Sequence, residues 1–303
     1  MKKSAFSLIE LSIVILIIGI LVAGVTQSSR LISKMRLASA RSQTQSSDVA
    51  SVKNTVFWLE TTSEKSFDDA ATEDDVNINS TTTNYSWYDI NNQISQKSNA
   101  SSATLGADYE VSGINNLPCL NFNGSTEFMD ITQTSGTSSQ LSVFIVFRNL
   151  TLPSGTPQAL ISIKDLDHTA ANNSFHINII NTSNVVQYDY FNGAGTAVTT
   201  AVTAAITANT PYLVDVIDDG TTTQTISLNS ATAMVRVAVS GTSGSKNLNA
   251  GFNIGSWDSL AAARARYFNG DIAEVILFDR ALKAEERNAI EKYLGKKWGI
   301  KSY

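Results

Sequence analysis

Glu10 is the one ionisable residue in an apolar run that extends from Phe6 to Val25. A charged side chain inside a bilayer costs about 2.5 to 3.5 kcal/mol, so an acid retained in such a segment indicates a function. The run is about long enough to cross a bilayer, and we expect residues 6–25 to form a transmembrane helix. Secretory signal peptides also begin with a basic start and an apolar run, but no small-residue cleavage site follows Val25.

The first ten residues combine a basic leader at Lys2 and Lys3, a small residue at Ala5, and Phe6 followed by Glu10. This combination resembles the N-terminus of type IV prepilins. The resemblance implies that a prepilin peptidase cuts between Ala5 and Phe6, that Phe6 is N-methylated, and that the apolar helix assembles with other pilin subunits. The family usually has Gly where this chain has Ala5. A plain N-terminal anchor with an incidental acid is the alternative.

Glu10 has a physical role if this cleavage occurs. A cut before Phe6 leaves an α-ammonium group at the start of the helix, and opposite charges attract far more strongly in a low dielectric than in water. The carboxylate of one subunit can meet the ammonium of the next, which sets the register of staggered helices and removes two unpaired buried charges. We therefore expect Phe6 and Glu10 to be assembly residues.

Catalysis has little support elsewhere in the chain. His168 and His176 are the only histidines, and no G-x-S-x-G motif accompanies them. Glycosidases need two carboxylates about 5 to 10 Å apart. Asp271 and Glu274 are two carboxylates on one predicted strand, but their spacing places them on opposite faces of a regular strand. We therefore expect that the protein is not an enzyme.

An acidic stretch between residues 60 and 75 contains carboxylates that could bind a cation. Calcium takes about 6 to 8 oxygen ligands, and the candidate ligands are Asp68, Asp69, Asp74 and Asp75. The stretch lacks EF-hand spacing, and a run of charges is more often a solvated loop. Calcium is the one cofactor that we consider, and the solvated loop is the alternative.

The composition indicates an extracytoplasmic, β-rich protein. Of 303 residues, 43% are hydrophobic and only 16% are charged, so the chain can bury a full core. The net charge of -5 argues against a nucleic-acid partner. Cys119 is the single cysteine and cannot form an internal disulfide, so it is expected to be a small buried hydrophobic residue.

The helix that starts in the apolar run should continue well beyond it. No Pro or Gly interrupts residues 26–53, and apolar side chains recur on one stripe at helical spacing, at Leu31, Met35, Ala38, Val49, Val52 and Val56. A helix from Phe6 to about Lys53 would be on the order of 70 Å long. Its second half would dock on a globular domain.

Four basic residues follow the apolar run, at Arg30, Lys34, Arg36 and Arg41, and outnumber the two leader lysines. The positive-inside count therefore opposes a cytoplasmic N-terminus. We set the count aside because the leader matches a signal that a specific enzyme recognises. The basic residues would then lie against lipid headgroups, pair with neighbouring subunits, or form a solvated helix face.

From Phe57 onward the hydrophobic pattern changes to the period of β-strands. Residues 141–147 are apolar on both faces, and Phe175, Ile177 and Ile179 alternate with His176 and Asn178 as in a half-buried strand. Further strands are predicted at 212–217, 225–228, 234–239 and 272–278, with a hairpin turn at Asp219-Gly220. One helix is predicted at 284–295. Many short strands with such turns favour a sandwich or jelly roll.

Four blocks of this half resemble concanavalin A-like or laminin G-like jelly-roll domains of bacterial surface proteins. They are residues 58–60 (WLE), 87–89 (WYD), 113–125 (GINNLPCLNFNGS) and 268–299, the last of which pairs a strand with a helix and a closing Trp. The family prefers Asp at Glu60, and Ser or Thr at Lys283 as a helix cap. Aromatic residues that could stack on sugars are Tyr188, Tyr190, Phe191 and Trp257, and they are equally good core candidates.

These observations predict an α+β chain with a leader at residues 1–5, a pilin-like helix at 6–53 and a jelly-roll domain at 54–303. Two functions compete. The first is a pilin or pseudopilin subunit, in a minor or tip position because its head is large, that passes from the bacterial inner membrane to a periplasmic or extracellular filament. The second is an anchored adhesin or lectin that binds a glycan or protein through its jelly-roll loops.

Overall fold

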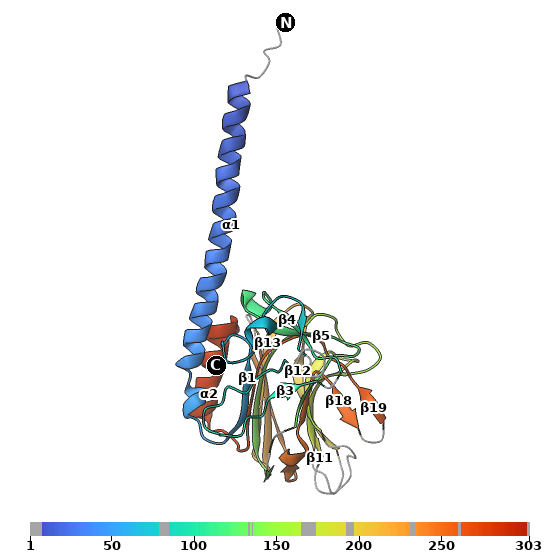
Figure 1. The fold of residues 1–303 in the computed structure, drawn as a ribbon. Helices are drawn as coiled ribbons and strands as arrows, with labels where there is room; N and C mark the ends of the chain where they lie inside the picture. The colour runs from blue at the N-terminus through green and yellow to red at the C-terminus, as the bar shows by residue number, and fades with distance from the viewer. Residues whose placement is uncertain are drawn as a thin grey trace.

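The structure is a computed structural model in which a long N-terminal helix projects from a β-sandwich head (Figure 1). It describes residues 8–78, 85–102, 104–132, 134, 136–164, 174–191, 197–230, 234–259 and 262–301. The observed α+β class, with a mostly β domain and a short C-terminal helix, confirms the prediction from sequence.

Helix α1 (Leu8–Gln45) is shorter than predicted, because it ends eight residues before Lys53. The hydroxyls of Ser46 and Ser47 donate to the carbonyl oxygens of Ser42 and Thr44, each at 2.9 Å, and these local bonds compete with continuation of the helix. A short 3₁₀ turn, η1 (Asp48–Ser51), then leads into the head. Within the described ranges, no helix combines the length and apolarity needed to cross a membrane, so the span predicted for residues 6–25 is not confirmed.

The larger sheet has nine antiparallel strands and follows the order β15-β14-β13-β8-β20-β5-β4-β2, with β1 paired to β20. Their bounds are β1 (Thr55–Glu60), β2 (Val76–Asn77), β4 (Asp108–Glu110), β5 (Cys119–Asn123), β8 (Leu141–Asn149), β13 (Pro211–Asp218), β14 (Thr223–Ser230), β15 (Met234–Ser240) and β20 (Asn269–Phe278). The predicted central strand is β8, the predicted Asp219-Gly220 hairpin joins β13 to β14, and both predictions are confirmed.

The smaller sheet has seven strands in the order β12-β11-β10-β9-β17-β6-β3. They are β3 (Ala100–Ser101), β6 (Met129–Ile131), β9 (Gln158–Ile163), β10 (Phe175–Ile179), β11 (Val185–Phe191), β12 (Ala197–Ala205) and β17 (Phe252–Ile254). Two short ribbons pair β7 (Thr137–Ser138) with β16 (Lys246–Asn247), and β18 (Trp257–Ser259) with β19 (Ala262–Ala265). Three further 3₁₀ turns are η2 (Asp69–Ala71), η3 (Ile114–Asn116) and η4 (Leu248–Ala250).

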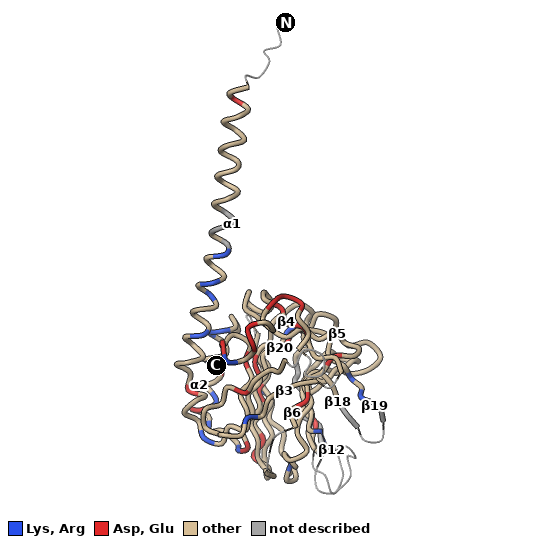
Figure 2. Tube along the Cα trace, in the orientation of Figure 1, with Lys and Arg blue, Asp and Glu red and all other residues tan. Residues whose placement is uncertain are grey.

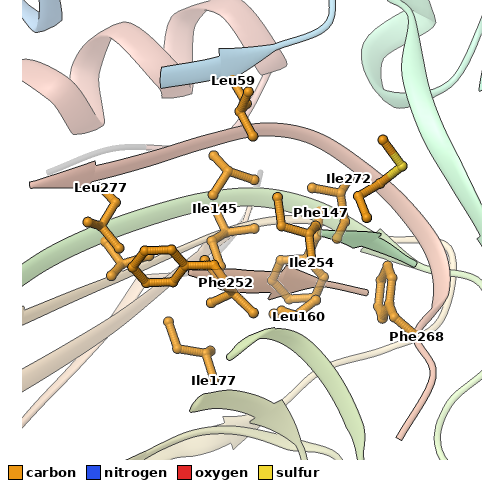
Figure 3. Close-up of a cluster of buried hydrophobic side chains, with 14 of the residues drawn as sticks. Leu59, Ile145, Phe147, Leu160, Ile177, Phe252, Ile254, Phe268, Ile272 and Leu277 are labelled. Atoms are coloured by element: carbon orange, nitrogen blue, oxygen red, sulfur yellow. The ribbon is translucent and has the colours of Figure 1, made fainter. Parts of the chain in front are cut away.

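The main core lies between the two sheets (Figure 3). Leu59, Ile145 and Leu277 of the larger sheet face Ile177 and Phe252 of the smaller one. All of these side chains are fully buried, as the period-two pattern requires.

Strand β10 differs from its prediction, because its polar face is buried as well. His176 Nε2 lies 2.9 Å from Asp189 Oδ2, and Asn178 Nδ2 donates to the same oxygen at 3.4 Å. Asp189 on the neighbouring strand β11 thus gives both buried side chains a polar partner.

A second apolar cluster covers the outer face of the larger sheet, where α2 (Ala284–Trp298) and the end of α1 pack. Ala40 of α1 and Ile290 and Trp298 of α2 belong to it. Lys283 makes no side-chain cap bond, as expected, and Glu286 Oε2 accepts from the backbone N–H of Lys283 at 3.0 Å, which is the other half of a capping box.

Candidate functional site

The N-terminal half of α1 presents a continuous apolar surface. Every large aliphatic side chain from Leu8 to Val22 is between 49% and 85% exposed. Glu10 lies in the first turn of this helix and is also exposed. Ala5 and Phe6 lie outside the described residues, so the processing site stays a prediction. An exposed apolar helix of this length indicates a surface that other molecules cover.

Basic residues follow this apolar segment on α1, whereas acidic residues gather on the adjoining edge of the head (Figure 2). Arg30, Lys34 and Arg36 are exposed. Arg41 lies lower on the helix, donates to the carbonyl oxygen of Thr62 at 2.8 Å and pairs with Glu64 at 2.5 Å. The last basic residue of the helix therefore contacts the head, while the three before it face solvent.

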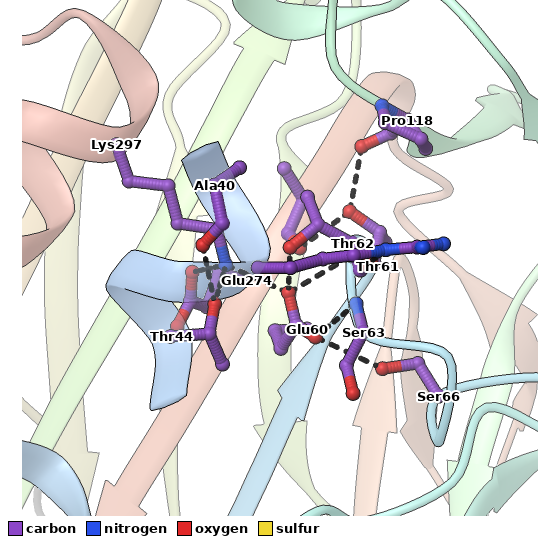
Figure 4. A network of polar contacts seen from close by, with 12 residues as sticks. Ala40, Thr44, Glu60, Thr61, Thr62, Ser63, Ser66, Pro118, Glu274 and Lys297 are labelled. Carbon is purple, nitrogen blue, oxygen red and sulfur yellow. Dashed lines mark hydrogen bonds and ion pairs between the residues drawn. The ribbon is translucent and has the colours of Figure 1, made fainter. Parts of the chain in front are cut away.

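The base of α1 is fixed to the head by buried polar contacts (Figure 4). Thr44 is only 5% exposed, and its hydroxyl accepts a hydrogen bond from Lys297 Nζ at 2.8 Å. The hydroxyls of Thr44 and Tyr293 lie 3.2 Å apart. We call the group formed by Thr44, Glu60, Glu274 and Lys297 the junction, because it joins both helices to the central strands.

Lys297 is the centre of the junction. Its ammonium lies 2.7 Å from Glu60 Oε2 and 3.0 Å from Glu274 Oε2, and all three side chains are completely buried. One cation between two carboxylates leaves an excess negative charge, which is costly in a dry interior unless other donors share it.

Those donors are present on both carboxylates. Glu274 accepts hydrogen bonds from Trp58 Nε1 at 2.7 Å, Trp298 Nε1 at 2.8 Å and the Tyr293 hydroxyl at 2.8 Å. Glu60 accepts from the backbone and hydroxyl of Thr62 and from neighbouring serines (Figure 4). Burial opposes ionisation of Glu60, but the Lys297 ammonium and these hydrogen bonds outweigh it and lower its pKa.

A second charged group lies under the other end of α2. Arg287 pairs with Asp215 at 2.5 Å and with Glu291 at 2.9 Å, and Arg236 reaches Glu291 at 2.7 Å. Burial raises the pKa of Asp215 to about 8, despite the opposing charge of Arg287. Buried polar contacts thus join the helix to the sheet near both of its ends.

The prediction that Asp271 and Glu274 occupy opposite faces is wrong. The register of β20 against β8 shifts between Ile272 and Glu274, which is a β-bulge. A bulge adds one residue and reverses the alternation, so both carboxylates point to the outer face of the sheet. Asp271 pairs with Arg148 at 2.5 Å and is 1% exposed, and Glu274 is enclosed in the junction. Neither carboxylate is open to a substrate.

The other candidates from the sequence occupy separate places. His176 is bound to Asp189, whereas His168 lies outside the described residues. Cys119 is buried, and burial raises the pKa of its thiol well above the usual range. Both observations fit structural roles for the described side chains.

The acidic candidates for calcium are not brought together as a ligand set. Tyr88 donates to Asp68 Oδ2 at 3.0 Å, and Asp74 Oδ1 accepts from the backbone of Val111 at 3.0 Å. Asp69 and Asp75 are exposed. In the part of the chain that the structure describes, no group of three His, Cys, Asp or Glu residues is placed to hold a metal ion.

Two of the aromatic residues considered for sugar stacking are core residues. Tyr188 and Tyr190 are fully buried between the sheets, and their hydroxyls donate to Asp218 at 2.7 Å and Gln224 at 3.0 Å. Trp257 is half-buried, with the guanidinium of Arg266 4.3 Å from its ring centroid. The side chain of Phe191 is outside the described set.

The contacts of the junction were not predicted from the sequence. Glu60 and Lys297 are 237 residues apart, and no local pattern links such distant positions. The one available signal was a charged residue next to large apolar residues, as at Glu60 after Phe57-Trp58-Leu59 and at Lys297 before Trp298. Such a position predicts a buried charge but not its partner.

Comparison with known proteins identifies the N-terminus and the fold class. Residues 1–26 match the family model of the prokaryotic N-terminal methylation motif, which confirms the predicted prepilin-like start. No curated protein matches the chain.

Solved structures resemble the head at low sequence identity. The binding domain of Paraclostridial Mosquitocidal Protein 1 is 12% identical with a TM-score of 0.54, and the match covers 83% of this chain and 56% of that one. The binding domain of botulinum neurotoxin serotype G is 10% identical with a TM-score of 0.52, over 80% and 51% of the two chains. This chain therefore spans about half the length of each toxin domain, and the likeness shows the fold alone.

A third similar structure is the Ruminococcus gnavus IT-sialidase CBM40 bound to alpha2,3 sialyllactose. It is 15% identical with a TM-score of 0.40, over 49% of this chain and 80% of that one.

Proposed function

We propose that this protein is a type IV pilin-like or pseudopilin-like filament subunit that carries a large β-sandwich head. The observation that carries the proposal is the methylation motif at residues 1–26, which contains the exposed apolar segment of α1 from Leu8 to Val22. Prepilin peptidase would cut between Ala5 and Phe6, Phe6 would be methylated, and the precursor would be held at the inner membrane until assembly.

The apolar segment would pack against the same segment of other subunits. Packing of aliphatic side chains and removal of their surface from water stabilise such a helix bundle. In the assembled helices, Glu10 would pair with the Phe6 amine of a neighbour and fix the register. The size of the head favours a minor or tip position, since every copy along a shaft would need room for it.

Intact mass and filament incorporation test this proposal. The mature chain should begin at Phe6 and carry one added methyl group. Glu10→Ala should still reach the membrane, since it removes a charge from an apolar segment, but should be depleted from sheared filaments. Ser12→Ala is a matched control on the same helix, because Ser12 makes only a local bond to the carbonyl oxygen of Ile9. Normal incorporation of Glu10→Ala would contradict the assigned role of Glu10.

The second candidate is an adhesin, in which the same helix presents a binding module of the laminin G-like or concanavalin A-like type. The support for it is the fold that the head shares with two toxin binding domains. We propose binding rather than catalysis because Glu274 is enclosed by Trp58 and Trp298, and Asp271 is paired with Arg148, so neither carboxylate is open to a substrate. Binding of the intact protein to cell-surface glycans or proteins would test this candidate.

A further inference from the structure

A pocket of about 470 Å³ opens in the head where β1 begins. Its described walls come from four separate parts of the chain, which are residues 54–56, residues 93–96 with Ser98, Thr134 and Asp279. Small-molecule sites commonly measure about 300 to 1,000 Å³. The pocket therefore has the volume of a site for one or two sugar rings.

Asp279 contributes a carboxylate to the pocket, and its backbone is held in place. Its backbone N–H donates to the carbonyl oxygen of Asn54 at 3.1 Å, and its own carbonyl oxygen accepts from the Ser138 hydroxyl at 2.7 Å. Oδ1 is enclosed and has no hydrogen-bond partner among the described residues. A buried acceptor without a donor costs free energy, and rotation about the Cβ–Cγ bond presents this oxygen to a ligand hydroxyl.

Asn54 lies on the wall in an unusual backbone conformation. Its φ of 69° is in the left-handed region, which Asn tolerates better than most residues but which still concentrates at functional sites. The Asn91 side chain donates to the carbonyl oxygen of Thr55 at 2.8 Å and holds the next peptide in place. The conformation is thus imposed by the surroundings and keeps the Asn54 amide at the pocket.

Gln93 offers the pocket an acceptor. Its Nε2 already donates to the carbonyl oxygens of Ala50 at 3.0 Å and Val52 at 2.6 Å. These two bonds use both amide protons, so Oε1 is the polar atom left for a ligand. Asp279 and Gln93 together supply acceptors at two places on the wall, as a compound with several hydroxyl groups requires.

The charge of the lining selects the class of ligand. Of the ten described residues that line the pocket, seven carry an amide or a hydroxyl, two are apolar, and Asp279 is the only ionisable one. Among these residues, phosphate, sulfate or carboxylate groups would meet a carboxylate and no cation. Hydroxyl groups would find both donors and acceptors, and Val56 and Ile94 would contact the C–H face of a ring.

The geometry points to a binding site for a neutral mono- or disaccharide unit in the pocket formed by Asn54, Gln93 and Asp279. This site would supply the ligand class of the adhesin candidate, and its biological role rests on that candidate. Binding at this site does not depend on filament assembly, because the pocket belongs to the head alone.

Isothermal titration calorimetry on the full chain tests the assignment, with the protein held in a zwitterionic detergent, since glycoside detergents would compete. The probes are glucose, galactose, mannose, N-acetylglucosamine, lactose and cellobiose, with N-acetylneuraminic acid as the charged comparison. Asp279→Asn keeps the shape of the side chain but loses its charge, and Ser95→Trp fills the pocket from an exposed position. Asp69→Asn is the matched control, because Asp69 is exposed and does not line the pocket.

At least one neutral sugar should bind the wild-type protein, Asp279→Asn should weaken it by about 10-fold or more, and Ser95→Trp should abolish it. The control should bind as the wild type does, and all variants should keep its melting temperature. The assignment is overturned by no binding at 20 mM sugar (about the weakest affinity worth assigning), by binding of the charged sugar alone, or by full affinity in both pocket variants. Filament incorporation of the same variants reports separately on the filament proposal, which fails only if the wild-type chain does not assemble.

Discussion

Lys297 Nζ, in the last helix of the chain, lies 2.8 Å from the hydroxyl of Thr44, which is one residue before the end of the first helix. The same ammonium contacts Glu60 of β1 and Glu274 of β20. One buried lysine therefore connects α1, which forms the stalk of the molecule, with the centre of the larger sheet. The orientation of this stalk on the head depends on that lysine.

Replacement of Lys297 by Met should destabilise the head strongly. The substitution leaves two carboxylates buried without a counter-charge, and removal of one member of a buried ion pair costs about 3 to 5 kcal/mol. Lys296→Met is the matched control, because Lys296 is the exposed neighbour on the same helix. Urea unfolding followed by tryptophan fluorescence measures the difference, and equal midpoints for the two variants would refute the role of Lys297.

Thr44→Val should loosen α1 without unfolding the head. The change keeps the volume but removes the acceptor for Lys297 Nζ, which costs about 1 to 3 kcal/mol when the donor stays buried. Limited proteolysis should cut the segment around residues 46–54 faster in Thr44→Val than in the wild type. Ser42→Ala removes an exposed hydroxyl two residues away and should not change the cleavage rate.

The boundary between helix and head should be placed before residue 40 for expression of the head alone. Ala40, Val49 and Val52 are buried against the larger sheet, so a chain that begins at Asn54 loses these contacts and Thr44. We expect it to melt about 5 to 10 °C below a chain that begins at Ser39. Both should give β-dominated circular dichroism spectra that reductant does not alter, since Cys119 is the only cysteine.

The stability of the head should depend on pH through Glu127. This carboxylate is 6% exposed and accepts from the backbone and side chain of Asn123 at 2.8 and 2.7 Å. Burial, together with the charge of Asp108, raises its pKa from 4.5 to about 7. The folded protein therefore binds this proton more tightly than the unfolded chain, and the free energy of unfolding should fall as the pH rises from 4.5 to 7.

Glu127→Gln should abolish the fall in the free energy of unfolding with rising pH, because an amide does not ionise. Between pH 4 and pH 8, the free energy of unfolding of this variant should rise by about 1 to 3 kcal/mol relative to that of the wild type. Glu285→Gln, at an exposed position of α2, should follow the wild-type curve. Parallel curves for Glu127→Gln and the wild type would show that Glu127 does not retain its proton.

The fold was largely predictable because its strands follow simple periodicities. Strand β8 is apolar on both faces and is the neighbour of β13 and β20 in the larger sheet, and the Asp219-Gly220 turn joins the hairpin that was expected. The predictions for the end of α1 and for the polar face of β10 were wrong because of polar contacts. Ser46 and Ser47 end α1 early, and the buried polar face of β10 depends on Asp189 from the next strand.

The candidate sites were less predictable because they depend on register and distant contacts. The alternation rule failed for Asp271 and Glu274, since the bulge is visible only in the pairing of β20 with β8. The two carboxylates that contact Lys297 come from β1 and β20, which are far from it in the sequence. The motif around Phe6 and Glu10, by contrast, is local and was recognised from the sequence.

The docked end of α1 also determines how the molecule would carry mechanical load. Along the chain, the turn that contains Ala40 and Thr44 comes before β1, so tension applied through the stalk reaches this turn first. While Thr44 remains bound to Lys297, the pull is distributed over α2 and the sheet beneath it. Only after that turn detaches would the force act on the pairing of β1 with β20. A head held in this way could yield at its attachment before its core begins to unravel.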